Sequence, residues 1–169
     1  ISFSVIFLIA YAAYFFTDIG RGLGALRDDD NRIEEPLDDN RIEEPLDNNK
    51  LPIPPLLEDK NPEEGKAEFD LKVQYGKTEF IKGYEANTLG YNGNYLGPVI
   101  RVNKGDDVKI NINNTLDEPT TVHWHGLEVA GEMDGGPHQV VDPNTTLESY
   151  FTIDQPAATL WYHPHLLHK

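Results

Sequence analysis

Two closely spaced pairs of histidines are the residues best able to carry chemistry in this chain of 169 residues. His123 and His125 form the first pair, and His163 and His165 form the second. The sequence contains no cysteine, which excludes a disulfide framework, a thiolate metal site and a cysteine nucleophile within these residues. Imidazoles without thiolates or a calcium-type carboxylate loop point to copper, zinc or iron.

The spacing of each pair indicates how the imidazoles would be used. In a β-strand, residues i and i+2 share a face about 6.5–7 Å apart, too far for two side chains of one rigid strand to chelate a single ion. Such a pair suits two neighbouring ions, and two strands with such pairs would present four imidazoles to one place. The alternative is a set of ordinary core or surface histidines. Val122 and Trp124 point to the opposite face, where we expect them to pack in the core.

The elements that must position these pairs are strands. From about residue 66, apolar residues alternate with polar ones, as in Phe69, Leu71 and Val73, and turn signals such as Tyr75-Gly76 recur at short spacing. Many short strands without an amphipathic helix indicate an all-β antiparallel sandwich or barrel. The further candidate strands are 78–82, 98–103, 107–112, 120–126, 147–153 and 158–163.

Two other zones precede this β-rich part. Residues 1–16 are uncharged and almost wholly apolar, which predicts a membrane anchor or a cleaved signal segment over 1–17; a buried core helix is the alternative. Residues 18–62 contain a twice-repeated acidic nonapeptide and several prolines, which indicates a disordered acidic linker. The formal net charge of −15 argues against nucleic-acid binding, because that function needs a basic face.

Three segments of the sequence resemble motifs of a known protein family. Residues 120–127 (TTVHWHGL) are similar to the first copper motif of multicopper oxidases, and residues 154–165 (DQPAATLWYHPH) resemble the second. Residues 131–137 (GEMDGGP) match the loop that links the two motifs in bacterial members. The resemblance covers residues 66–169 and is strongest to bacterial laccase-like oxidases, including the copper efflux oxidase.

The resemblance implies a fold and an activity. Residues 63–169 would form the N-terminal plastocyanin-like domain of a three-domain enzyme, a cupredoxin-like Greek-key β-sandwich that is incomplete at its C-terminal end. Such enzymes take single electrons from a phenol, an aromatic amine or a metal ion at a type 1 copper. They reduce dioxygen to water at a trinuclear copper cluster. The type 1 site and half of the cluster ligands would lie in C-terminal cupredoxin domains of the parent chain, so this part alone would be inactive.

The family pattern also assigns roles to residues. His123 would bind the type 2 copper, His125 and His163 would share one type 3 copper, and His165 would bind the other. Asp134 would act near the cluster in proton delivery, although Asp is also common in turns. The pattern assigns no ligand role to His138 or His168, whose contact with the cluster stays open.

Other functions are compatible with parts of the pattern. A non-catalytic copper-binding cupredoxin for storage or sensing is the main alternative. A scaffold relative without copper is disfavoured because all four expected histidines are present, and a zinc hydrolase is disfavoured because no carboxylate has suitable spacing. The apolar residues 1–16 predict a location at the cell surface or outside the cell, by membrane attachment or secretion.

Overall fold

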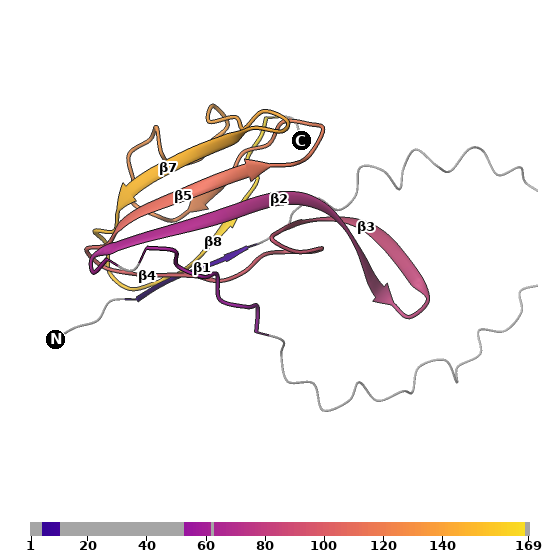
Figure 1. Cartoon of the computed structure of the whole chain (residues 1–169), viewed down its shortest axis with the longest axis horizontal. Coiled ribbons are helices and arrows are strands. Elements are labelled where there is room, and N and C mark those ends of the chain that lie inside the picture. Colours follow the sequence, from indigo (N-terminus) through magenta and orange to yellow (C-terminus); the bar gives the residue numbers. More distant parts are fainter. Residues whose placement is uncertain (1–4, 11–52, 62, 168–169) are drawn as a thin grey trace, which may run out of the picture. The chain divides into compact units, whose positions relative to one another are not determined.

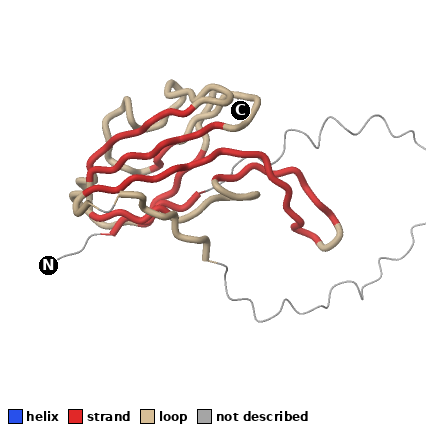
Figure 2. Tube along the Cα trace, viewed as in Figure 1, coloured by secondary structure: helices blue, strands red, loops and turns tan. Residues whose placement is uncertain are grey.

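The computed structural model describes residues 5–10, 53–61 and 63–167 (Figure 2). Within these ranges the regular elements are all strands, and no helix is long and apolar enough to span a membrane. The strands are β1 (Val5–Ala10), β2 (Lys66–Ile81), β3 (Tyr84–Tyr91), β4 (Ile100–Asn103), β5 (Asp107–Asn114), β6 (His123–His125), β7 (Thr146–Thr152) and β8 (Thr159–His163).

The strands form two four-stranded sheets, in the orders β3-β2-β5-β7 and β4-β1-β8-β6 (Figure 1). Strand β2 pairs antiparallel with β3 and parallel with β5, and β5 pairs antiparallel with β7. Among the described residues, strand β6 lies at one edge of the second sheet and pairs with β8 alone, in antiparallel register. The all-β sandwich predicted from the sequence is therefore confirmed, but its sheets are not purely antiparallel as expected, because β2–β5 and β1–β8 pair in parallel.

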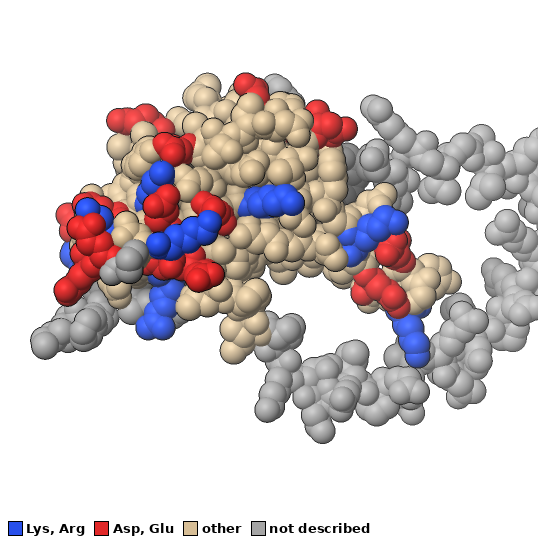
Figure 3. Space-filling model, in the orientation of Figure 1, with Lys and Arg blue, Asp and Glu red and all other residues tan. Residues whose placement is uncertain are grey.

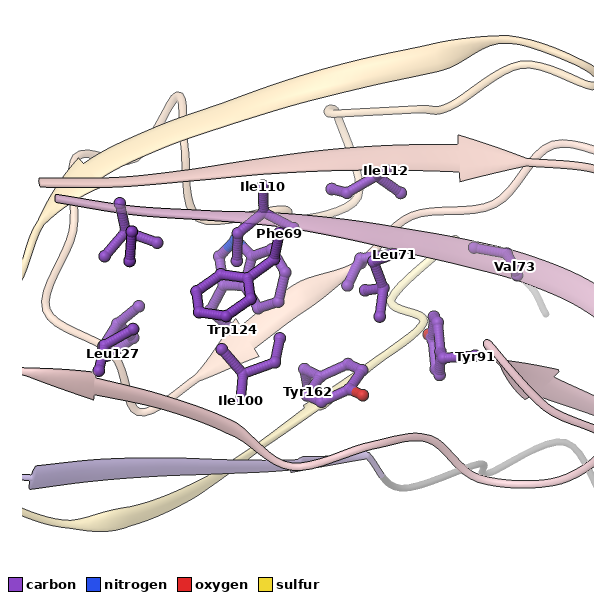
Figure 4. Packing of buried hydrophobic residues seen from close by; sticks show 14 of the residues in the cluster. Phe69, Leu71, Val73, Tyr91, Ile100, Ile110, Ile112, Trp124, Leu127 and Tyr162 are labelled. Atoms are coloured by element: carbon purple, nitrogen blue, oxygen red, sulfur yellow. The ribbon is translucent and has the colours of Figure 1, made fainter. Parts of the chain in front are cut away.

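The core lies between the two sheets and follows from the alternation along their strands (Figure 4). Alternate residues of β2 are buried from Ala67 to Val73, and those of β5 are buried from Val108 to Ile112. From the second sheet, Trp124 and Tyr162 enter the core with no exposed surface. Each large apolar side chain buried in this way contributes about 1.5–3 kcal/mol to folding. The predicted inward orientation of Val122 and Trp124 is borne out.

Strand β2 is longer than the sequence pattern predicts. The expected break at Tyr75-Gly76 is wrong, because Gly76 continues the ladder and pairs with Thr88 of β3. A Cβ atom on Gly76 would lie 2.3 Å from the carbonyl oxygen of Asn94. Glycine marks a close backbone approach here and not a turn. The resulting β2–β3 hairpin projects beyond the rest of the sandwich (Figure 1).

Residues 54–61 belong to the same compact unit as the sandwich, which shortens the predicted linker over 18–62 at its C-terminal end. The backbone of Leu57 donates to Val99, and Val99 donates back to Pro55, both at 2.8 Å. Lys60 donates its backbone N–H to Glu68, and its ammonium pairs with Asp70. Prolines and acids suggested an extended tether, but these backbone bonds hold the extended segment against the domain. Residues 18–52 lie outside the described ranges.

The apolar N-terminal segment also differs from its prediction. Of the expected anchor or signal over 1–17, residues 5–10 are described, and they form β1 inside the second sheet. Strand β1 pairs antiparallel with β4 and parallel with β8, so both of its backbone edges are hydrogen-bonded. A continuous apolar run is typical of a strand flanked on both sides, and periodicity cannot distinguish it from a membrane segment.

The outward face of the β3-β2-β5-β7 sheet interleaves both charge signs (Figure 3). Lys109 pairs with Glu68 at 3.3 Å and with Glu148 at 3.0 Å, and Asn111 donates to Asp70 at 2.8 Å. Neighbouring opposite charges neutralise one another locally. This face therefore offers no continuous basic surface.

Candidate metal centre

The register of two neighbouring strands brings the two histidine pairs together. In the β6–β8 ladder, His123 lies opposite His163, Trp124 opposite Tyr162, and His125 opposite Trp161. Because side chains alternate between faces, Trp124 and Tyr162 fill the core while the histidines share the other face. Two short motifs separated by almost forty residues thus meet through a three-residue strand.

The imidazoles form one compact group. The ring centroid of His123 lies 5.5 Å from that of His125, 5.3 Å from that of His163 and 5.1 Å from that of His165. Possible ligand nitrogens of His123, His125 and His163 lie within 4.8 Å of one another, the single such group of histidine or acidic residues within the described ranges. The four imidazoles therefore lie together as expected, but strand parity accounts only for His123, His125 and His163, because β8 ends at His163.

Both ring nitrogens of His163 have polar neighbours, and burial affects its pKa. Its Nε2 lies 3.1 Å from Nδ1 of His125, and its Nδ1 lies 2.6 Å from the carbonyl oxygen of Pro164. Burial lowers the pKa of His163 below its usual value, and the neighbouring histidines lower it further against the opposing effect of the Pro164 contact. A lowered pKa favours the neutral imidazole, which is the form that binds a metal ion.

Asp134 contacts His123 through two different oxygens. Nδ1 of His123 lies 2.9 Å from the Asp134 carbonyl oxygen and 3.2 Å from its carboxylate Oδ2. The backbone N–H of Trp124 also donates to that carbonyl, at 3.1 Å. The loop carrying Asp134 is therefore attached to β6 at the first histidine pair. These contacts use Nδ1 of His123 and leave Nε2 available for a metal ion.

Sequence reasoning missed several residues around the group. The Trp161 ring stacks against the ring of His125 and against that of His163, at centroid distances of 4.5 and 4.1 Å. Buried Gln155 accepts from the backbone of Glu128 at 2.7 Å and donates to Gly126 at 3.3 Å, which ties the second motif to the turn after the first. The two-residue offset from His163 could have revealed Trp161. Gln155 gave no such signal, because its contacts depend on the folded loops.

The remaining histidines lie apart from the group or outside the description. His138 is exposed and lines a cavity of about 240 Å³ between the 131–140 loop and β7. It does not belong to the three-histidine group. His168 lies outside the described residues, so its relation to the cluster stays a prediction.

The donor set fits copper. The group offers imidazole nitrogens, and the sequence contains no cysteine that would favour a thiolate site. Neutral imidazole ligands suit copper, zinc and iron, and they hold both oxidation states of copper. The nearest acidic side chain, Asp134, contacts the Nδ1 edge of His123 as a hydrogen-bond partner would. Geometry alone therefore permits several metals.

Comparison with known proteins identifies the family of this chain. A model of the multicopper oxidase family matches residues 72–169. The chain belongs to the multicopper oxidase family. Multicopper oxidase mco of Staphylococcus aureus is 55% identical over 112 residues, which cover 66% of this chain and 25% of that protein. Cell division protein FtsP of Escherichia coli is 45% identical over 113 residues, covering 67% and 23% of the two chains.

Solved structures give the same assignment. Laccase from Pediococcus acidilactici is 39% identical, with a TM-score of 0.65 over 70% of this chain and 26% of that chain. A laccase-like multicopper oxidase from Ochrobactrum is 42% identical, with a TM-score of 0.61 over 69% and 26%. This chain thus spans about a quarter of the length of these multicopper oxidases. The family resemblance and the cupredoxin-like fold expected from the motifs are confirmed.

Proposed function

We propose that this chain supplies the N-terminal copper-binding part of a laccase-like multicopper oxidase. The observation that carries the proposal is the group formed by His123, His125 and His163, whose ligand nitrogens lie within 4.8 Å of one another. Bound copper would supply the redox chemistry that couples one-electron oxidation of a substrate to four-electron reduction of dioxygen to water. This chain would provide half of the histidines of a trinuclear site.

Each histidine has a proposed place. His123 would bind the type 2 copper, because its Nδ1 is held by Asp134 and its Nε2 stays available. His125 and His163 would share one type 3 copper, a role supported by the 3.1 Å separation of their nitrogens. His165, whose ring stacks on that of His163 at 5.9 Å, would serve the other type 3 copper.

Asp134 is proposed as the acid that moves protons near the cluster. Oxygen reduction consumes protons, so an acid close to the site is useful. The Asp134 side chain is 34% exposed and contacts the His123 side chain, which is 16% exposed, so Asp134 is open to solvent and also touches the imidazole group. This position lets the carboxylate exchange protons with water on one side and contact a histidine on the other.

The substrate, the remaining partners and the location are proposals drawn from the family. The reducing substrate would be a phenol, an aromatic amine or a metal ion, and dioxygen would be the acceptor. Type 1 copper and the other histidines would come from C-terminal cupredoxin domains of the parent chain. We place the protein at the cell surface or outside the cell.

Copper titration of this chain tests the proposal. We expect the chain to bind copper through the histidine group, and His123→Ala to weaken binding by at least about tenfold. His138→Ala is the matched control, because this exposed histidine lies outside the group. Equal loss in both variants, or no copper binding, would contradict the proposed site.

Oxygen uptake separates the oxidase from its alternative. The chain has no cysteine for the type 1 copper of the family pattern, so we expect copper binding without sustained oxygen consumption with a phenol or cuprous ion. Supplying the C-terminal domains should restore consumption. Copper binding with no consumption even then would favour a non-catalytic cupredoxin for storage or sensing.

A further inference from the structure

His165 needs a restraint that the strands do not provide. Strand β8 ends at His163, and Pro164 follows, so His165 lies outside the β6–β8 ladder that positions the other three histidines. It is also the histidine of the two pairs that lies outside the group with ligand nitrogens within 4.8 Å. The register that aligns His123 with His163 therefore does not fix the fourth imidazole.

A hydrogen bond between His165 and the first copper motif provides this restraint. The backbone N–H of His165 donates to Oγ1 of Thr121 at 2.6 Å. The two residues are 44 positions apart in the chain, and Thr121 lies two positions before His123. One hydroxyl thus joins the segment that leads into the first histidine pair to the last histidine of the second pair.

Thr121 is well suited to hold its partner in place. Its side chain has no exposed surface, and its branched Cβ restricts χ1 rotation. The adjacent residue Thr120 exchanges two backbone hydrogen bonds with Val141, at 3.1 and 2.8 Å, which anchors this part of the backbone. The hydroxyl is therefore presented from a buried, fixed position and not from a mobile loop.

We infer that Thr121 is a positioning residue for the proposed copper centre. Its hydroxyl holds the backbone of His165 so that the fourth imidazole lies beside His123 and His163, with ring centroids 5.1 and 5.9 Å away. The inference rests on the proposed function for its metal, while the contact itself exists in the protein without metal. Thr121 itself would not contact the metal and would act only through His165.

Two substitutions isolate the hydroxyl. Thr121→Val keeps the branched shape and removes the acceptor, and Thr121→Ser keeps the acceptor and removes only the methyl group. Partners that orient a metal ligand typically change metal affinity by about 10–100-fold when they are lost. We expect Thr121→Val to lower the copper affinity of the chain about tenfold and to alter the Cu(II) electron paramagnetic resonance spectrum. Thr121→Ser should retain both wild-type properties.

Amide hydrogen exchange of the metal-free chain provides the second readout. We expect the His165 amide to be protected in the wild type and in Thr121→Ser, and to exchange at least about tenfold faster in Thr121→Val, while amides of β5 keep their rates. An unprotected His165 amide in the wild type would overturn the inference, even if Thr121→Val failed to fold. An unchanged copper spectrum and exchange rate in folded Thr121→Val would also overturn it.

The results distinguish a failure of the proposed function from a failure of the role of Thr121. If the wild-type chain binds no copper, the proposed function fails, and with it the metal-positioning role of Thr121. If copper binds through the histidine group but Thr121→Val behaves like the wild type, the proposed function stands and the role of Thr121 is wrong.

Discussion

His123 and Asp134 are joined through one imidazole nitrogen and two oxygens. The carbonyl oxygen of Asp134 lies 2.9 Å from Nδ1 of His123, and its carboxylate Oδ2 lies 3.2 Å away. The backbone contact orients the imidazole whatever the side chain at position 134. The carboxylate is therefore not required to hold the ring, which separates a role in proton transfer from a role in ligand orientation.

Asp134→Asn should slow oxygen reduction without removing copper. The substitution preserves the carbonyl that orients His123 but removes a proton-exchanging group, whose contribution to such steps is about a hundredfold or more. We expect the full-length protein to keep its copper content while turnover falls by about a hundredfold. Copper analysis and oxygen consumption on the same sample check this. A parallel loss of copper and turnover would show that the carboxylate has a structural role.

Gly135→Ala should disrupt the loop that carries Asp134. Gly135 has a φ of +72°, and an added Cβ would lie 1.7 Å from the carbonyl oxygen of Val122. The backbone conformation alone costs about 1–2 kcal/mol for a non-glycine residue, and the clash adds to it. Urea denaturation should show a loss of at least about 2 kcal/mol. Gly131→Ala is the control, because nothing lies within 4 Å of its Cβ position; equal effects would contradict the argument.

The hydrogen bond between Tyr75 and Asp117 should be visible in a phenol titration. This bond, with burial and the negative charge of Asp117, raises the pKa of Tyr75 to about 12. A raised pKa contributes stability that is fully present below pH 10 and is lost as the pH rises through about 12. Asp117→Asn should move one phenolate transition towards pH 10, and Tyr75→Phe should remove that transition. Identical absorbance titrations would contradict the contact.

Deletion of residues 1–17 should weaken the second sheet. Strand β1 separates β4 from β8 and pairs with both, so its loss leaves two strand edges without partners. Unpaired edges promote association. We expect residues 18–169 to unfold at lower urea concentration and to self-associate in sedimentation experiments. Unchanged stability together with loss of vesicle binding would instead support the predicted membrane anchor.

Much of the site could be predicted because it depends on local patterns. Alternation in a strand places His123 and His125 on one face and Trp124 in the core, and the family motifs align the two pairs. The contact of Thr121 with His165 could not be predicted, because it joins two non-strand positions. The role of residues 5–10 also escaped, since an apolar run has the same composition in a sheet and in a membrane.

Anomalous diffraction at the copper edge can show directly whether the histidine group holds copper. Crystals of the copper-loaded chain should show anomalous density among the imidazoles of His123, His125 and His163, whose ligand nitrogens lie within 4.8 Å of one another. The same density should be absent from crystals of His123→Ala grown and loaded identically. Copper found only at other residues, or equal density at this site in the variant, would contradict the proposed copper centre.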